Sequence, residues 1–125
     1  NEKESDQIAA VLGIENGENS PETLQQRAAE ICKKLAIQTT VIHPVKYAVA
    51  ANQQETAYVE GPFVAKPRIS TGAGDHFNAG FSFGTLLNLD LTSSLLTGVS
   101  TSGFYVRNAQ SPSVEQLIEF LNNWQ

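Results

Sequence analysis

Residues 70–81 read STGAGDHFNAGF, and this stretch carries most of the information about the fold. Two glycines, Gly72 and Gly74, stand directly before a run in which aromatic and small residues recur at i, i+3, i+4 and i+7 up to Gly84. That spacing is typical of a helix, and its small residues favour a close approach to a sheet. The pattern predicts a tight glycine turn at the start of a largely buried helix that begins near Asp75.

The same turn is suited to bind an anion. Unpaired backbone N–H groups and the helix dipole favour negative charge at a helix start, and glycine lets the backbone approach the anion closely. A carboxylate at Asp75 would repel a phosphate bound there. The arrangement makes chemical sense if Asp75 accepts a proton from an attacking hydroxyl while nearby amides hold the phosphoryl group. The alternative is a plain loop in which Asp75 decorates the helix start, and the stretch matches neither of the common glycine-rich nucleotide loops.

The rest of the chain alternates helical and extended patterns. Gly13 predicts the end of a first helix, Ser20 and Pro21 predict the start of a second, and Ser113 with Gln116 predicts a capping box before a last one. The expected segments are helices over 2–12, 21–35, a mixed stretch over 91–107 and a helix after 113, with strands over 38–42, 47–51 and 56–59. These elements predict a layered α/β architecture in one domain over residues 1–125.

Composition limits the classes of function. The 125 residues carry 8 Lys and Arg against 13 Asp and Glu, a net charge of -5, which disfavours nucleic acid as a partner. No apolar stretch approaches the ~20 residues of a membrane helix, and no leader opens the sequence. We expect a soluble, cytoplasmic protein with no membrane partner, in which the single cysteine, Cys32, is a buried structural thiol.

Residues 70–81 closely resemble the second signature of the ribokinase/PfkB carbohydrate kinase family, which runs D-T-x-G-A-G-D-x-F-x-A-G. The resemblance implies a ribokinase-like layered fold, of which this chain is the carboxy-terminal, catalytic part. It further implies that Asp75 is the catalytic base, that Gly72, Ala73 and Gly74 form the anion hole, and that Thr71 contacts the nucleotide.

A second match lies at the start of the chain, where Asn1-Glu2-Lys3-Glu4 resembles the N-x-x-E motif of the same family. By resemblance, Asn1 and Glu4 organise Mg²⁺ and phosphate, with Glu4 acting through metal-bound water. Taken alone the motif is weak, and its alternative is an exposed helix start with solvated acids.

Three departures from the family pattern affect the nucleotide and cation sites. Residues 42–47 read IHPVKY where the family has T-x-G-x-x-G, so we expect contacts from Lys46 or Tyr47 in place of glycine backbone. Ile69 replaces the opening Asp of the second signature, and the later V-T-R-x-G-A-x-P stretch is shortened over residues 106–112. Those segments often form the monovalent-cation site, so K⁺ activation is not expected.

Histidines and aromatic residues are assigned structural roles. His43 and His76 match no metal-ligand spacing, and His76 need not touch Asp75 because neighbours on a helix point about 100° apart. Phe77, Phe81, Phe83 and Trp124 are expected in the core and not on a base-stacking platform.

The leading hypothesis is a PfkB-type carbohydrate kinase that moves the terminal phosphate of ATP, with Mg²⁺, to a hydroxyl of a sugar or sugar phosphate. The alternatives are a nucleoside kinase of the same superfamily and a noncatalytic binding descendant of the fold. The family's amino-terminal half supplies most sugar contacts, so that half is an expected partner and the isolated chain is expected to be inactive. A homodimer is left open.

Overall fold

A computed structural model describes residues 1–15 and 17–124 of the chain. We expected one domain over residues 1–125; the structure divides into two compact units, Asn1–Tyr58 and Val59–Gln125. None of the helices in the described part of the chain is long and apolar enough to cross a membrane.

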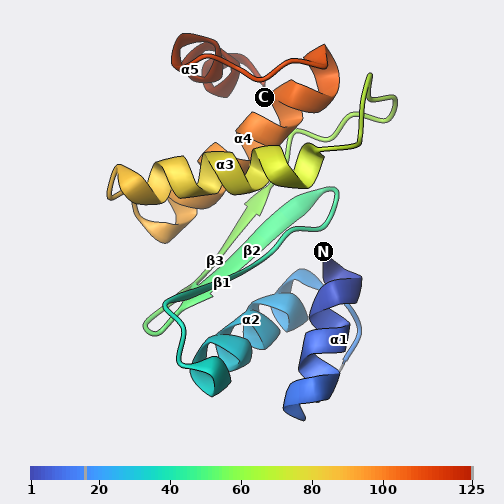
Figure 1. Ribbon diagram of the computed structural model, residues 1–125, viewed down its shortest axis with the longest axis vertical. Helices are drawn as coiled ribbons and strands as arrows, with labels where there is room; N and C mark the ends of the chain where they lie inside the picture. Colours follow the sequence, from blue (N-terminus) through green and yellow to red (C-terminus); the bar gives the residue numbers. More distant parts are fainter. Residues whose placement is uncertain (16, 125) are drawn as a thin grey trace. The chain divides into compact units, whose positions relative to one another are not determined.

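The first unit contains two helices followed by antiparallel strands (Figure 1). Its elements are α1 (Glu2–Leu12), α2 (Pro21–Leu35), β1 (Thr39–Ile42), β2 (Tyr47–Asn52) and the first part of β3 (Thr56–Glu60). The sheet order is β1-β2-β3. β1 pairs antiparallel with β2, with Thr39 opposite Asn52 and Ile42 opposite Val49. The predicted helices and strands of this unit are therefore confirmed.

Local signals explain these boundaries. Gly13 ends α1 in the left-handed conformation at φ 64°, which glycine adopts without strain. Ser20 caps α2 by accepting a hydrogen bond from the Thr23 N–H group, with proline in the first turn. The β2–β3 turn is closed by the Asn52 side chain, whose oxygen accepts from the Gln54 and Glu55 N–H groups at 2.8 and 2.9 Å.

An apolar layer joins α2 to the sheet of this unit. Buried side chains of Leu24 and Ala28 on α2 cluster with Ile42, Val49 and Ala51 on β1 and β2. Cys32 is fully buried beside this layer, and its Sγ lies 3.1 Å from the Ala51 carbonyl oxygen. The prediction of a buried structural thiol is confirmed.

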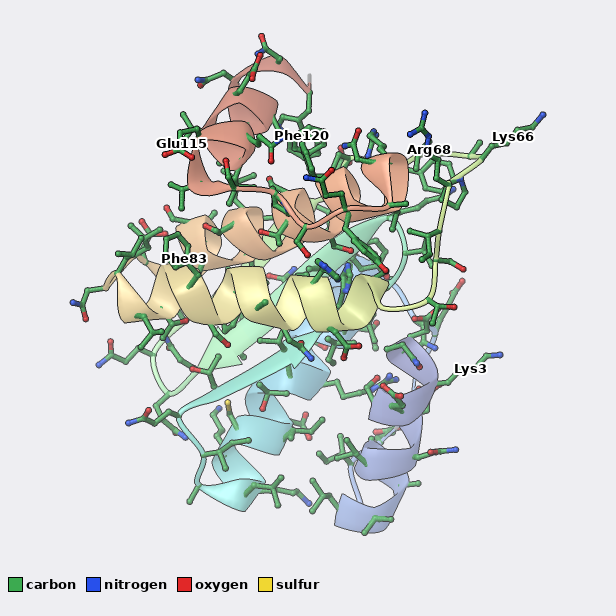
Figure 2. All side chains as sticks on the ribbon, turned by 45° about the horizontal axis from the view of Figure 1, so that its top comes forward. Lys3, Lys66, Arg68, Phe83, Glu115 and Phe120 are labelled. Carbon is green, nitrogen blue, oxygen red and sulfur yellow. The ribbon has the colours of Figure 1, made fainter. Side chains whose placement is uncertain are left out.

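The second unit is formed by the helices α3 (Ala73–Leu86), α4 (Leu91–Asn108) and α5 (Val114–Asn123). Asp90 caps α4, and Ser113 and Gln116 form the predicted capping box at the start of α5. The Phe120 ring of α5, labelled in Figure 2, packs edge-on against Phe104 of α4 with ring centroids 5.8 Å apart. The Arg107 guanidinium lies over the same ring at 5.5 Å.

Glycines bring α3 and α4 into close contact. A Cβ atom at Gly80 would lie 2.4 Å from Thr101 Oγ1 and 2.6 Å from the Thr97 carbonyl oxygen, and one at Gly84 would lie 2.9 Å from the Cα of Ser94. All of these neighbours belong to α4. The interpretation that these small residues face a sheet was therefore wrong, because they face a neighbouring helix. Burial on α3 is confined to Phe77, Gly80 and Gly84, so the prediction of a largely buried helix was wrong as well.

We predict that Gly80→Ala destabilises the protein by about 1–3 kcal/mol, because the added methyl group overlaps the α4 backbone. Gly74→Ala on the same helix is the matched control. Its Cβ would meet nothing within 4 Å, so this change is expected to be neutral or stabilising by up to about 1 kcal/mol. Urea unfolding of the two variants measures the difference, and equal effects would contradict the close packing of α3 on α4.

Candidate active site

The glycine turn lies at the start of α3, as predicted. Gly72 has φ 87°, in the left-handed region, and serves as the N-cap of a helix that begins at Ala73, two residues before the predicted start. Ala73 N–H donates to the Ser70 carbonyl oxygen at 3.1 Å, and His76 N–H donates to the Gly72 carbonyl oxygen at 3.1 Å. No side chain among the described residues caps this helix. Because Ala73 N–H is bonded to the Ser70 carbonyl oxygen, the first-turn amides that remain available to an acceptor are those of Gly74 and Asp75.

Two aromatic side chains support the turn. The Tyr105 hydroxyl of α4 donates to the Thr71 carbonyl oxygen at 3.0 Å, and its ring stacks on the His76 imidazole with centroids 3.6 Å apart. His76 Nδ1 lies 2.8 Å from the Gly72 carbonyl oxygen, and Nε2 lies 2.8 Å from Ser111 Oγ. Because a carbonyl oxygen can accept but not donate, Nδ1 carries a proton. In the neutral ring, Ser111 then donates to Nε2.

The segment that leads into the turn is held against the last turns of α4. Arg107 Nη1 donates to the Pro62 and Gly103 carbonyl oxygens at 2.6 and 3.0 Å. Arg68 N–H donates to the Val106 carbonyl oxygen at 2.8 Å. The Arg68 and Lys66 side chains extend from this irregular segment as exposed cations (Figure 2). The last turns of α4 thus order the backbone segment that precedes Gly72.

Asp75 lies on the wall of a cavity of about 320 Å³ within the second unit. The cavity is bordered by α3, by α4 through Thr101, and by the loop and first turns of α5, with mostly apolar walls. Phe83, expected in the core, is 38% exposed and lines this cavity, whereas Phe77 is buried as predicted. The geometry combines an exposed carboxylate, an uncapped helix start and an apolar recess.

Asn1 and Glu4 lie in the first unit, where they form a capping box at the start of α1. Asn1 Oδ1 accepts from Glu4 N–H at 3.1 Å, and Glu4 Oε2 lies 2.5 Å from the Asn1 backbone nitrogen. The Glu4 side chain is 68% exposed. Among the described residues, no group of three or more His, Cys, Asp and Glu side chains could hold a metal ion. The two residues are therefore brought together, with a carboxylate open to water.

A buried arginine holds the start of α1 in place. Arg27 of α2 is 2% exposed, and its Nη1 donates to Ser5 Oγ and Asn19 Oδ1 at 2.9 Å and pairs with Asp6 Oδ1 at 2.7 Å. Ser5 Oγ in turn donates to the Glu2 carbonyl oxygen at 2.7 Å. Because a buried charge needs both a counter-ion and hydrogen bonds, this network fixes α1 against α2.

Lys46 and Tyr47 line a second cavity, of about 270 Å³, together with Glu2 and Asn19. Burial, then the carboxylates of Glu2 and Glu22, raise the pKa of Tyr47 above its usual value. Burial lowers the pKa of His43 to about 4, so this imidazole is neutral at pH 7. Lys46 and Tyr47, two of the residues predicted to contact nucleotide, thus lie beside the start of α1 within the first unit, whereas Thr71 belongs to the second unit.

Sequence reasoning missed three residues of the site in the second unit. His76 was assigned away from the site, yet it lines the same cavity as Asp75. Tyr105 and Ser111 were not considered, and each meets the glycine turn or His76 from more than 30 residues away in sequence. Helical spacing alone contains no signal for such contacts.

Comparisons with known proteins identify relatives of this chain. A family model described as prokaryotic ketohexokinase matches residues 1–124. A ketohexokinase from Haloferax volcanii is 28% identical over 124 residues, which cover 99% of this chain and 32% of that protein. The chain therefore spans about a third of the length of this relative.

Solved structures match the fold over nearly the whole chain. A ribokinase from Thermotoga maritima matches with a TM-score of 0.77 at 19% identity, and the match covers 98% of this chain and 40% of the ribokinase chain. A phosphofructokinase-2 mutant from Escherichia coli has a TM-score of 0.75 at 18% identity over 95% and 38% of the two chains. These likenesses show the ribokinase-like α/β fold, which confirms the expected fold class. With the family model matching almost every residue, the chain belongs to the prokaryotic ketohexokinase family.

Proposed function

We propose that this chain is the catalytic part of a longer sugar kinase, which transfers the terminal phosphate of ATP to a sugar hydroxyl. The name of the matched family supports a ketohexose as the acceptor. By the resemblance of residues 70–81, the chain corresponds to the carboxy-terminal half of such a kinase. The amino-terminal half would supply most contacts to the sugar.

The observation that carries the proposal is the position of Asp75. Its carboxylate stands in the first turn of α3, beside amides without a side-chain acceptor and on the wall of a cavity. A phosphoryl group held by these amides would face an acceptor hydroxyl whose proton passes to a carboxylate oxygen of Asp75. The new oxygen–phosphorus bond forms as the bond to the leaving nucleoside diphosphate breaks.

The hydrogen bonds of the turn limit which amides of the anion hole proposed for Gly72, Ala73 and Gly74 can bind a phosphoryl oxygen. Ala73 N–H is already bonded to Ser70, so the amides of Gly74 and Asp75 are the better donors to a phosphoryl oxygen. Gly72 contributes its left-handed conformation, which lets the chain turn into the helix directly before these amides.

The apolar cavity next to Asp75 offers a place for the nucleoside of the donor. Its walls include Phe83 and Leu117, with Ser111 and Ser113 as polar groups. A mostly apolar recess with a few polar groups is the usual form of a small-molecule site. Contacts from Thr71, Lys46 and Tyr47 to the nucleotide remain part of the proposal.

Asn1 and Glu4 fit a role toward Mg²⁺, because both offer oxygen atoms and the Glu4 carboxylate is open to water. When bound, the ion would neutralise charge on the donor phosphates. The capping box orients the Glu4 side chain independently of any metal. No specific observation favours a nucleoside kinase, since the likeness to a nucleoside kinase from Methanocaldococcus jannaschii, at 20% identity, extends to the fold alone.

We predict that Asp75→Asn in the intact kinase lowers turnover by roughly 10²–10⁴-fold, the usual contribution of a positioned general base. Nucleotide affinity should stay nearly unchanged, because the amide keeps the shape of the side chain and the backbone donors remain. Fructose phosphorylation kinetics and a direct ATP-binding titration measure the two effects separately.

Asp90→Asn is the matched control for this experiment. Asp90 caps α4 through its side chain, and asparagine is an equally good cap, so the variant loses a carboxylate but no helix start. Its turnover should stay at the wild-type level. Near-normal turnover of Asp75→Asn would refute Asp75 as the base and, with it, the proposed reaction.

We predict that Glu4→Gln raises the Mg²⁺ concentration needed for half-maximal activity, because it removes the charge while glutamine still completes the capping box. Glu22→Gln, in the exposed first turn of α2, is the control for loss of a carboxylate. A magnesium titration of activity compares the variants. If Glu4→Gln behaves like Glu22→Gln while Glu4→Ala loses stability, the motif is a cap and not a metal site.

A further inference from the structure

We propose that Tyr105 is a positioning residue for phosphoryl transfer, which holds the Gly72 turn in the shape that presents its amides to the phosphoryl group. The inference rests on the proposed function and extends it to a residue that makes no contact with the reacting atoms. It is carried by the contacts of Tyr105 with both sides of the turn.

Tyr105 and His76 donate hydrogen bonds to two successive backbone carbonyl groups of the turn. The Tyr105 hydroxyl binds the Thr71 carbonyl oxygen at 3.0 Å, while His76 binds the Gly72 carbonyl oxygen through Nδ1 at 2.8 Å and through its backbone N–H group at 3.1 Å. The two rings stack nearly parallel, with an interplanar angle of 11°. Because these bonds hold the Thr71 and Gly72 carbonyl groups, they fix the Thr71–Gly72 and Gly72–Ala73 peptide planes, and with them the start of the helix on which the Gly74 and Asp75 amides stand.

The turn is packed on one side and open on the other. A Cβ atom at Gly72 would lie 3.2 Å from the Tyr105 hydroxyl oxygen, so the phenol lies directly against the Cα of this residue. A Cβ atom at Gly74 would meet nothing within 4 Å. Tyr105 therefore packs directly against Gly72, while the space around the Cα of Gly74 is open.

The support itself is firmly held. Tyr105 lies near the end of α4, between Gly103 and Arg107, which contact Pro62, and the Val106 carbonyl oxygen accepts from Arg68 N–H. Preorganised donors stabilise a transition state because no reorganisation is needed as charge develops. Loss of the Tyr105 hydroxyl should therefore lower the rate of the chemical step more than it lowers the affinity for substrate.

The test is Tyr105→Phe in the intact kinase, since phenylalanine keeps the ring and loses the hydroxyl group. We expect kcat to fall by about 10- to 10²-fold, the scale of a small misplacement of catalytic groups, with KM values within about twofold. Affinity for ADP with aluminium fluoride, a mimic of the transferring phosphoryl group, should fall by the same factor, while affinity for ADP alone should not.

Thr85→Val is the matched control, because it also deletes a hydroxyl that donates to a backbone carbonyl oxygen at 3.0 Å, at the far end of α3. This variant should keep wild-type kinetics. If Tyr105→Phe matches it while Asp75→Asn is inactive, the positioning role is refuted and the proposed function stands. If Asp75→Asn is active, the proposed function fails first.

Thermal unfolding of all variants separates loss of fold from loss of positioning. A kcat of Tyr105→Phe that falls only in proportion to its loss of thermal stability would overturn the inference.

Discussion

The close contact between α3 and α4 is the constraint on which the site in the second unit depends. Gly80 and Gly84 present no side chain to α4, and Gly98 of α4 lies against the Phe77 ring, where a Cβ atom would come within 2.8 Å. Helices that meet through glycine lie closer than helices separated by large side chains. This approach lets the last turns of α4 reach the backbone that precedes α3, and the glycine turn, its aromatic support and the cavity wall at Thr101 all follow from it.

The electrostatics of the turn explain why a carboxylate and an anion site can share one helix start. The dipole and free amides of α3 favour negative charge at this position, whether it comes from Asp75 or from a bound phosphoryl group. Two negative groups there repel each other, and in the proposed reaction the transfer of a proton to the carboxylate would relieve that repulsion as the acceptor oxygen attacks.

Features with a local cause were predictable from the sequence, and features with a distant partner were not. The ends of α1, α2 and α5 follow from Gly13, Ser20 and Ser113, whose caps act within a few residues. The glycine turn was also predictable, because its conformational demand falls on Gly72 itself. By contrast, the helical spacing of α3 indicated that one face carries small residues, but it did not indicate whether a sheet or another helix packs against that face. The pairing of His76 with Ser111, 35 residues away, depends on tertiary packing in the same way.

The start of α1 shows how one short motif can satisfy both folding and chemistry. The capping box engages Asn1 Oδ1 and Glu4 Oε2, and it holds the carboxylate in one orientation. The Arg27 network stabilises the following residues of α1, since it joins Ser5 and Asp6 to α2. A carboxylate ordered in this way loses little further conformational entropy when it binds a hydrated cation. Under the proposed metal role, the structural and the functional explanations of the motif are compatible, because the cap would preorganise the acid.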